Sequence, residues 1–171
     1  MFLKGIKRKS AQKYLIKQLQ EKRVVDQSKI KTIGVLVDAT VFESFPFLNE
    51  ITEVFGVSAE SITLLYYHPD KKVAEASTES VFTDNNLGFK GQLNNSNANE
   101  FLSTDFDALL SFYNEDKQLL NLAAVQSKAK YKIGFAGVHE QINDLCVVTE
   151  LSDVKTFTFE LKKYLSILNK I

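Results

Sequence analysis

The segment that most constrains the fold is a short apolar run, Ile-Gly-Val-Leu-Val, within residues 31–38. Polar residues bound the run on both sides, and it does not alternate between apolar and polar positions. A continuous run of this length is typical of a strand that is buried on both faces, as the strands of a parallel sheet are. In α/β proteins, helices on both sides of the sheet provide this burial, so the run is the first indication of an α/β fold.

The rest of the chain supplies the elements that such a sheet needs. After the first strand we expect a helix that is capped by Ser44, contains Pro46 in its early turn and ends at Gly56. Further strands are predicted at 61–68, 80–83, 108–113, 131–135 and 145–149, and further helices at 97–103, 116–127 and 154–167. Most of residues 70–104 carries turn signals and little periodicity, so it is predicted to be loop.

These elements predict a three-layer, Rossmann-like domain with a mostly parallel sheet of about five strands. A helix over residues 3–23 is expected in front of it, because apolar positions there recur at mostly helical spacing. We therefore divide the chain into a basic N-terminal helix, residues 1–28, and a single α/β domain, residues 29–171. At 171 residues the chain is long enough for one self-sufficient core.

The charge of the chain is divided unequally along its length. Residues 1–31 hold ten Lys or Arg against two acidic residues, a net charge of +8, so the other 140 residues carry −8. Such an asymmetry suggests a polyanionic partner for the basic segment. The candidate polyanion-binding residues are Lys4, Lys7, Arg8, Lys9, Lys13, Lys17, Lys22 and Arg23.

The basic helix has three interpretations. Lys9, Lys13 and Lys17 recur every four residues, so on a helix they form one cationic face that suits the phosphates of RNA or of a ribonucleoprotein. A second interpretation places the helix on an anionic membrane surface, with Phe2, Leu3, Ile6 and Leu15 in the lipid interface. In the third, the helix packs its apolar side on its own domain or on a partner subunit, and the lysines only face solvent.

Polar residues that follow the strands are the candidates for a ligand pocket, since open α/β sheets bind ligands beyond the carboxyl ends of their strands. An acid-base site would use a histidine oriented by Asp38. The alternative is that Asp38 and Asn114 cap neighbouring turns or helices. The candidate pocket residues are Asp38, Thr40, His68, Asn114, Gly137 and His139.

Two resemblances accompany these observations. The chain as a whole resembles an uncharacterised bacterial family of unknown function with a basic N-terminal helix and one α/β domain, most clearly in Ser-Lys-Ala-Lys-Tyr-Lys-Ile-Gly-Phe at 127–135. Residues 105–137 also resemble the N-terminal domain of heptosyltransferase-type glycosyltransferases. That second resemblance implies an alternative function, a degenerate or single-domain glycosyltransferase-like enzyme with a pocket at the strand ends.

The few histidines, the single cysteine and the lack of a phosphate-binding motif set the expectations for a metal, a cofactor and the cellular compartment. His68 and His139 have no cysteine or carboxylate at metal-ligand spacing, so no metal site is expected. No glycine-rich phosphate motif is present, and we expect no bound cofactor. A single cysteine, Cys146, forms no internal disulfide, and lysines interrupt any apolar signal segment, so we expect a cytoplasmic protein. The favoured function is a non-enzymatic binding or regulatory protein.

Overall fold

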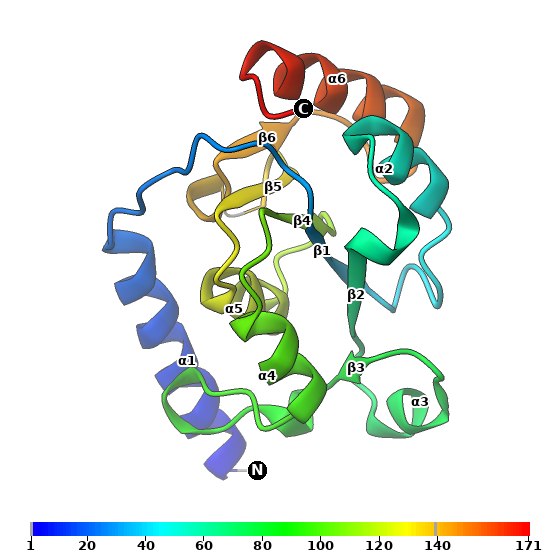
Figure 1. Ribbon diagram of the computed structural model, residues 1–171. Helices are drawn as coiled ribbons and strands as arrows, with labels where there is room; N and C mark the ends of the chain where they lie inside the picture. Colours follow the sequence, from blue (N-terminus) through cyan, green and yellow to red (C-terminus); the bar gives the residue numbers. More distant parts are fainter. Residues whose placement is uncertain (1, 139) are drawn as a thin grey trace.

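The computed structural model describes residues 2–138 and 140–171, and it contains six strands and six α-helices in that part of the chain (Figure 1). The strands are β1 (Ile33–Asp38), β2 (Ile62–Tyr67), β3 (Val81–Phe82), β4 (Ala108–Phe112), β5 (Tyr131–Phe135) and β6 (Leu145–Val147). The helices are α1 (Phe2–Gln20), α2 (Leu48–Phe55), α3 (Lys71–Ala76), α4 (Ser96–Ser103), α5 (Gln118–Gln126) and α6 (Val154–Ile167).

The six strands form one parallel sheet in the order β3-β2-β1-β4-β5-β6. The α/β prediction is therefore confirmed, and the sheet has one strand more than expected. The first half of the chain forms β1, β2 and β3 in order from the centre of the sheet to one edge, and the second half forms β4, β5 and β6 toward the other edge. β1 and β4, which are far apart in sequence, therefore pair in the middle. The order of connection reverses between these two strands, and this is where an open α/β sheet leaves room for a ligand.

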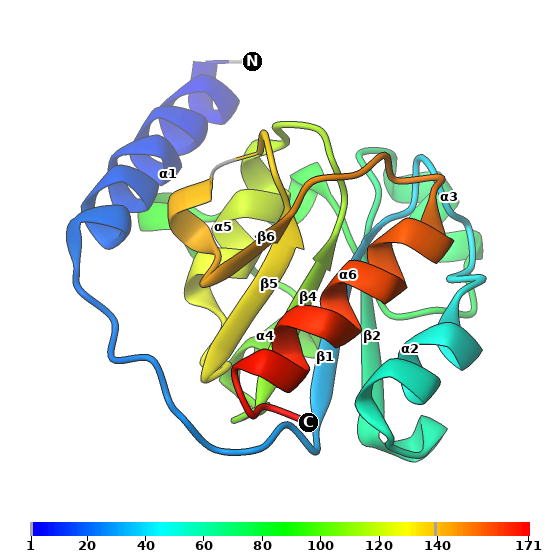
Figure 2. The ribbon, with the colours of Figure 1, turned by 90° about the horizontal axis from the view of Figure 1, so that it is seen from above.

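Two hydrophobic cores lie on opposite faces of the sheet, which confirms the three-layer arrangement (Figure 2). Alternate residues of β1 divide between them, because successive side chains of a strand point to opposite faces. Val35 and Val37 pack with α2 and α6 in one core, which includes Ile51 and Phe157. Leu36 packs with α4 and α5 in the other core.

Helix α1 lies outside α5, on the far side of the molecule from α6 (Figures 1 and 2). Ala11 and Leu15 are buried against the domain, and the Gln118 amide donates a 2.9 Å hydrogen bond to the Arg8 carbonyl. The apolar side of α1 therefore packs on its own domain, as the third interpretation expected, and this packing leaves the role of the exposed lysines open. The helix ends at Gln20 rather than Arg23, because Arg23 turns toward the domain and its guanidinium donates to the carbonyls of Ala129 and Lys130.

Two expectations for the helices are wrong. Ser44 does not cap α2 and Pro46 precedes that helix, which begins at Leu48. The reason is that Phe45 is buried against Phe112 and its N–H donates to the Tyr66 hydroxyl at 3.0 Å, which holds the chain outside a helix up to that point.

The second error is the segment after β2, which contains a short helix, α3, where only loop was expected. The Asp70 side chain accepts the Lys72 N–H at 2.8 Å and so caps this helix. The other elements lie where the periodicity predicted them, within a few residues at their ends.

Candidate functional site

The carboxyl end of β1 carries a buried carboxylate, Asp38, which is 1% exposed. One of its oxygens accepts the Thr40 N–H at 3.0 Å and the Thr40 hydroxyl at 2.7 Å. Its other oxygen forms an ion pair with Lys117, whose ammonium also contacts the Thr40 hydroxyl at 2.6 Å. Asp38 thus orders the turn after β1, as the turn-capping interpretation predicted, and it is neutralised by a lysine that the sequence did not single out.

Lys117 follows β4 and stands just before α5, so its pair with Asp38 spans the two central strands where the connection order reverses. Lys117 also lies 3.3 Å from Glu115. The side chains of the protein itself therefore occupy the position at which many α/β sheets place a ligand. No pattern in the sequence marks Lys117, which is 79 residues from Asp38.

A cavity of about 620 Å³ lies beside the ends of β1, β2 and β3 and is lined by Ala39, His68, Lys72 and Val81, among others. His68 accepts the Asp70 N–H at its Nδ1 at 3.0 Å. Asp38 does not line this cavity and directs both carboxylate oxygens to Thr40 and Lys117. The acid-base pair that the sequence suggested, a histidine oriented by Asp38, is therefore not formed with His68.

The remaining pocket candidates are spread along the same edge of the sheet. Asn114 follows β4 and is exposed. Gly137 follows β5, and its N–H donates a 3.1 Å hydrogen bond to the carboxylate of Glu140. His139 lies outside the described residues. The described candidates thus lie at or just after the carboxyl ends of four neighbouring strands, and among these candidates only Asp38 and Thr40 are joined by a hydrogen bond.

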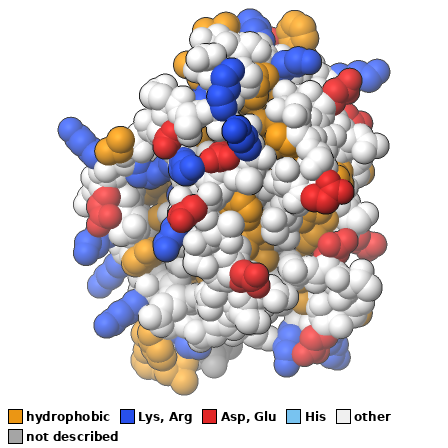
Figure 3. All heavy atoms as spheres, in the orientation of Figure 1, with side chains coloured by type: hydrophobic (Ala, Val, Ile, Leu, Met, Phe, Trp, Pro, Cys, Tyr) orange, Lys and Arg blue, Asp and Glu red, His pale blue; other side chains and the backbone are white. Residues whose placement is uncertain are grey.

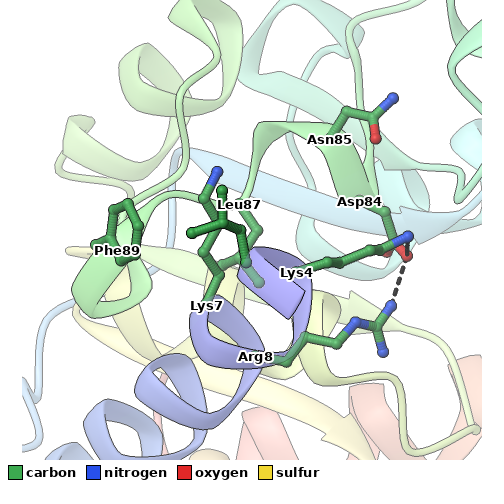
Figure 4. A pocket seen from close by; sticks show the side chains of 8 residues that line it. Lys4, Lys7, Arg8, Asp84, Asn85, Leu87 and Phe89 are labelled. Atoms are coloured by element: carbon green, nitrogen blue, oxygen red, sulfur yellow. Dashed lines mark hydrogen bonds and ion pairs between the residues drawn. The ribbon is translucent and has the colours of Figure 1, made fainter. Parts of the chain in front are cut away.

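Several of the basic residues are used to attach α1 and the segment after it to the domain. Lys4 and Arg8 both contact the carboxylate of Asp84, at 3.3 and 2.5 Å, beside a hollow of about 300 Å³ (Figure 4). The Tyr67 hydroxyl donates to the same carboxylate at 2.8 Å. Burial raises the pKa of Asp84, but the hydrogen bond from Tyr67 and the Arg8 charge outweigh it and hold the pKa below its usual range.

Two more cations of the basic segment also have internal partners. The Lys7 ammonium lies over the Phe89 ring, 5.5 Å from its centre. Arg23 forms an ion pair with Asp144 at 3.3 Å in addition to its carbonyl contacts. These four residues, Lys4, Lys7, Arg8 and Arg23, therefore have roles within the fold.

The other lysines of α1 face away from the domain. Lys9, Lys13 and Lys17 are exposed, and within residues 2–138 and 140–171 their side chains have no ionic or hydrogen-bond partner. Three apolar residues, Phe2, Ile6 and Ile16, are exposed on the same side of the helix. We call these six residues the outward face of α1. Figure 3 shows basic side chains along this side of the molecule and an apolar cluster at its lower left.

A further lysine reaches this region from another part of the chain. Lys90, in the 3₁₀ turn Phe89–Gly91, is exposed, and its N–H donates to the Ser10 hydroxyl of α1 at 3.1 Å. It has a left-handed backbone, with φ of 58°, which a residue with a side chain rarely adopts. The next residue, Gly91, packs so closely on Tyr14 that a Cβ there would lie 3.1 Å from the ring.

Comparison with known proteins identifies the family. A model for a family of unknown function, DUF6913, matches residues 7–168. The chain belongs to this family. The match includes most of α1 as well as the sheet and its helices, in agreement with the resemblance to an uncharacterised family. No curated protein and no solved structure matches the chain.

The glycosyltransferase resemblance is not supported by these comparisons. In this DUF6913 chain, residues 105–137 contain β4, α5 and β5, a β-α-β unit that many α/β proteins share. The described residues, 2–138 and 140–171, contain no group of three histidine, cysteine or acidic side chains placed to hold a metal ion. They also contain no helix with the length and apolar character needed to cross a bilayer.

Proposed function

We propose that this protein is a binding protein that attaches to anionic lipid surfaces through the outward face of α1. The observation that carries the proposal is that this face presents lysines and large apolar side chains together, with Phe2 83% exposed. We expect α1 to lie along the membrane surface, with the apolar side chains of its outward face at the boundary of the acyl chains and its lysines at the lipid phosphates. Lysines extend to the headgroups while their stems stay near the apolar layer.

The charges set the size of the expected effect. Each lysine near an anionic membrane contributes about 1 kcal/mol, so Lys9, Lys13 and Lys17 together contribute about 3 kcal/mol, on the order of a hundredfold in affinity. This attraction falls as salt is added, because exposed charges are screened. The apolar side chains add a contribution that salt does not weaken.

The same lysines suit the phosphates of RNA, which is the competing partner. RNA binding without sequence preference usually adds aromatic side chains on which bases stack. Tyr14, the aromatic residue between these lysines in the sequence, is half-buried against Gly91 and the core. The side chains of Ile6 and Ile16 carry neither a charge nor a hydrogen-bond donor and so have nothing to offer a phosphate. Their exposure therefore favours a lipid surface over RNA.

Vesicle binding tests the proposal. Full-length protein is sedimented with vesicles of phosphatidylcholine alone and of phosphatidylcholine mixed with phosphatidylserine. We expect binding to the mixed vesicles only, and a loss on the order of a hundredfold in the variant Lys9→Gln/Lys13→Gln/Lys17→Gln. A matched variant, Lys71→Gln/Lys72→Gln/Lys163→Gln, removes three exposed lysines elsewhere and should bind almost as the natural chain does.

A second pair of measurements separates lipid from RNA. Phe2→Ala/Ile6→Ala should weaken vesicle binding at high salt, and fluorescence anisotropy with a single-stranded RNA should show weak binding that this variant does not change. Equal binding of neutral and anionic vesicles would overturn the proposal. So would tight, salt-dependent RNA binding by a chain that ignores vesicles, which would assign the face to nucleic acid.

A further inference from the structure

On the side of the sheet opposite α1, helices α2 and α6 form a second exposed surface (Figures 1 and 2). A groove of about 240 Å³ runs between them. Glu50 and Glu53 of α2 line one wall, and Lys155, Phe159 and Lys162 of α6 line the other. We call these five residues the α2–α6 face.

The α2–α6 face has one exposed aromatic residue and two walls of opposite charge. Phe159 is 67% exposed, although it stands in a helix whose Phe157 and Leu161 are fully buried. Its position beside Lys155 and Lys162 follows from helical spacing, since residues three and four apart share one side of a helix. Among the described residues, no ion pair joins Glu50 or Glu53 to either lysine.

This arrangement of charges is complementary to itself. In a two-fold symmetric pair, the same surface of each copy meets its counterpart, so residues of one wall contact the other wall of the second copy. A two-fold axis along the groove places the glutamates of each α2 opposite the lysines of the other α6. It also places each Phe159 against the groove of the second copy. Aromatic residues that fill a pocket at the centre of an interface commonly dominate its stability.

We infer that the α2–α6 face is a docking surface for a second copy of this chain. The pair is held by Phe159 in the centre and by reciprocal contacts between the acidic wall of one copy and the basic wall of the other. Because α1 lies on the opposite side of the sheet, a pair formed in this way leaves the outward face of both α1 helices free.

Charge reversal supplies the decisive experiment, with mass measured by analytical ultracentrifugation on full-length chains. Natural chains should form a dimer whose fraction rises with concentration. Glu50→Lys/Glu53→Lys and Lys155→Glu/Lys162→Glu should each remain monomeric, since each then presents two walls of the same sign. A mixture of these two variants should form a heterodimer, because every wall again meets its opposite.

Phe159→Ala and Phe89→Ala form a matched pair that does not depend on charge. Phe89 is an exposed phenylalanine outside the α2–α6 face, so its loss should leave the dimer unchanged. Loss of Phe159 should raise the dissociation constant at least tenfold. The variant without Lys9, Lys13 and Lys17 should dimerise as the natural chain does.

Three results would overturn the inference. They are a natural chain that stays monomeric at every concentration, a mixture of the two charge variants that does not associate, and a dimer that survives Phe159→Ala. Circular dichroism of each variant shows whether it is folded. If a charge-reversed chain unfolds, the comparison of Phe159→Ala with Phe89→Ala decides.

Discussion

Arg8 of α1 donates a 2.5 Å hydrogen bond to the carboxylate of Asp84, which lies 76 positions later in the chain. Lys4 approaches the same carboxylate, and Tyr67 donates to it from β2. Asp84 therefore joins the N-terminal half of α1 to the sheet. The basic segment is thus both part of the folded domain and, at Lys9, Lys13 and Lys17, a surface that faces solvent.

Asp84→Asn should loosen α1 while leaving the sheet intact. The side-chain oxygen of the new asparagine can still accept the hydrogen bond from Tyr67, but the negative charge that attracts Lys4 and Arg8 is lost. Because these two cations are about half exposed, we expect the free energy of unfolding to fall by only about 1 kcal/mol. Hydrogen exchange should speed up in α1 and stay unchanged in β1. Glu75→Gln, which removes an exposed ion pair with Lys71, is the control and should change neither. Equal protection of α1 in both variants would contradict this role for Asp84.

The same carboxylate gives a pH dependence. The folded-state pKa of Asp84 is lowered, so its stabilising contribution is present above the unfolded-state pKa of about 3.9 and is lost as the pH falls through the lower folded-state value. The difference in unfolding free energy between the natural chain and Asp84→Asn should therefore shrink below about pH 4. Urea titrations at a series of pH values measure it. A difference that stays constant down to the acid limit would show that the charge of Asp84 is not stabilising.

Lys132→Met should remove a rise of stability with pH. Lys132 is 2% exposed, and its ammonium donates to the carbonyls of Ala124 and Val125 at the end of α5. Burial, with the nearby Arg23 charge, lowers its pKa to about 7. Between that value and the usual lysine pKa of about 10.4, the unfolded chain binds a proton that the folded chain does not.

In that window the free energy of unfolding of the natural chain should rise, by up to about 1.4 kcal/mol per pH unit relative to Lys132→Met. Below pH 7 the difference between the two chains should level off. Chemical denaturation from pH 6 to pH 10 measures both proteins side by side. Parallel curves over the whole range would mean that Lys132 keeps its proton in the fold.

Lys117→Met should destabilise the protein by about 3 kcal/mol, because it leaves the buried Asp38 carboxylate without a counter-charge. Replacing both partners, as Asp38→Asn/Lys117→Met, should restore most of this loss, since no buried charge is then left unpaired. Urea denaturation of the two single variants and the double variant gives the coupling energy. A single variant that costs only a few tenths of a kcal/mol would show that the carboxylate is adequately solvated without Lys117.

Gly34→Ala should destabilise the centre of the sheet by about 1–3 kcal/mol. A Cβ at position 34 would lie 2.8 Å from the rings of both Phe101 and Phe106, which pack where β1 meets α4. Gly5→Ala in α1 is the matched control, because a Cβ there meets open space. That variant should gain up to about 1 kcal/mol from helix propensity. Thermal unfolding distinguishes the two, and a neutral Gly34→Ala would show that the two rings move apart easily.

The prediction of the fold from sequence succeeded where the signal is local. The apolar run of β1 and the helical spacing in α5 and α6 predicted their elements because burial on one side or both sides sets the residue pattern directly. It failed at α2, where the burial of Phe45 against Phe112 delays the start of the helix. It also missed α3, which has no buried residue and hence no apolar pattern to detect.

The charge asymmetry and the buried strand were determined by the sequence alone, since both are properties of neighbouring residues. Which charges remain available was decided only by the tertiary structure. Arg8 meets Asp84 and Lys117 meets Asp38 across 76 and 79 positions, whereas Lys9 and Lys13, one and five positions from Arg8, face solvent. An ion pair depends on the distance between two side chains in space, and the packing of α1 and of the central strands, which sets that distance, is not encoded in any local pattern.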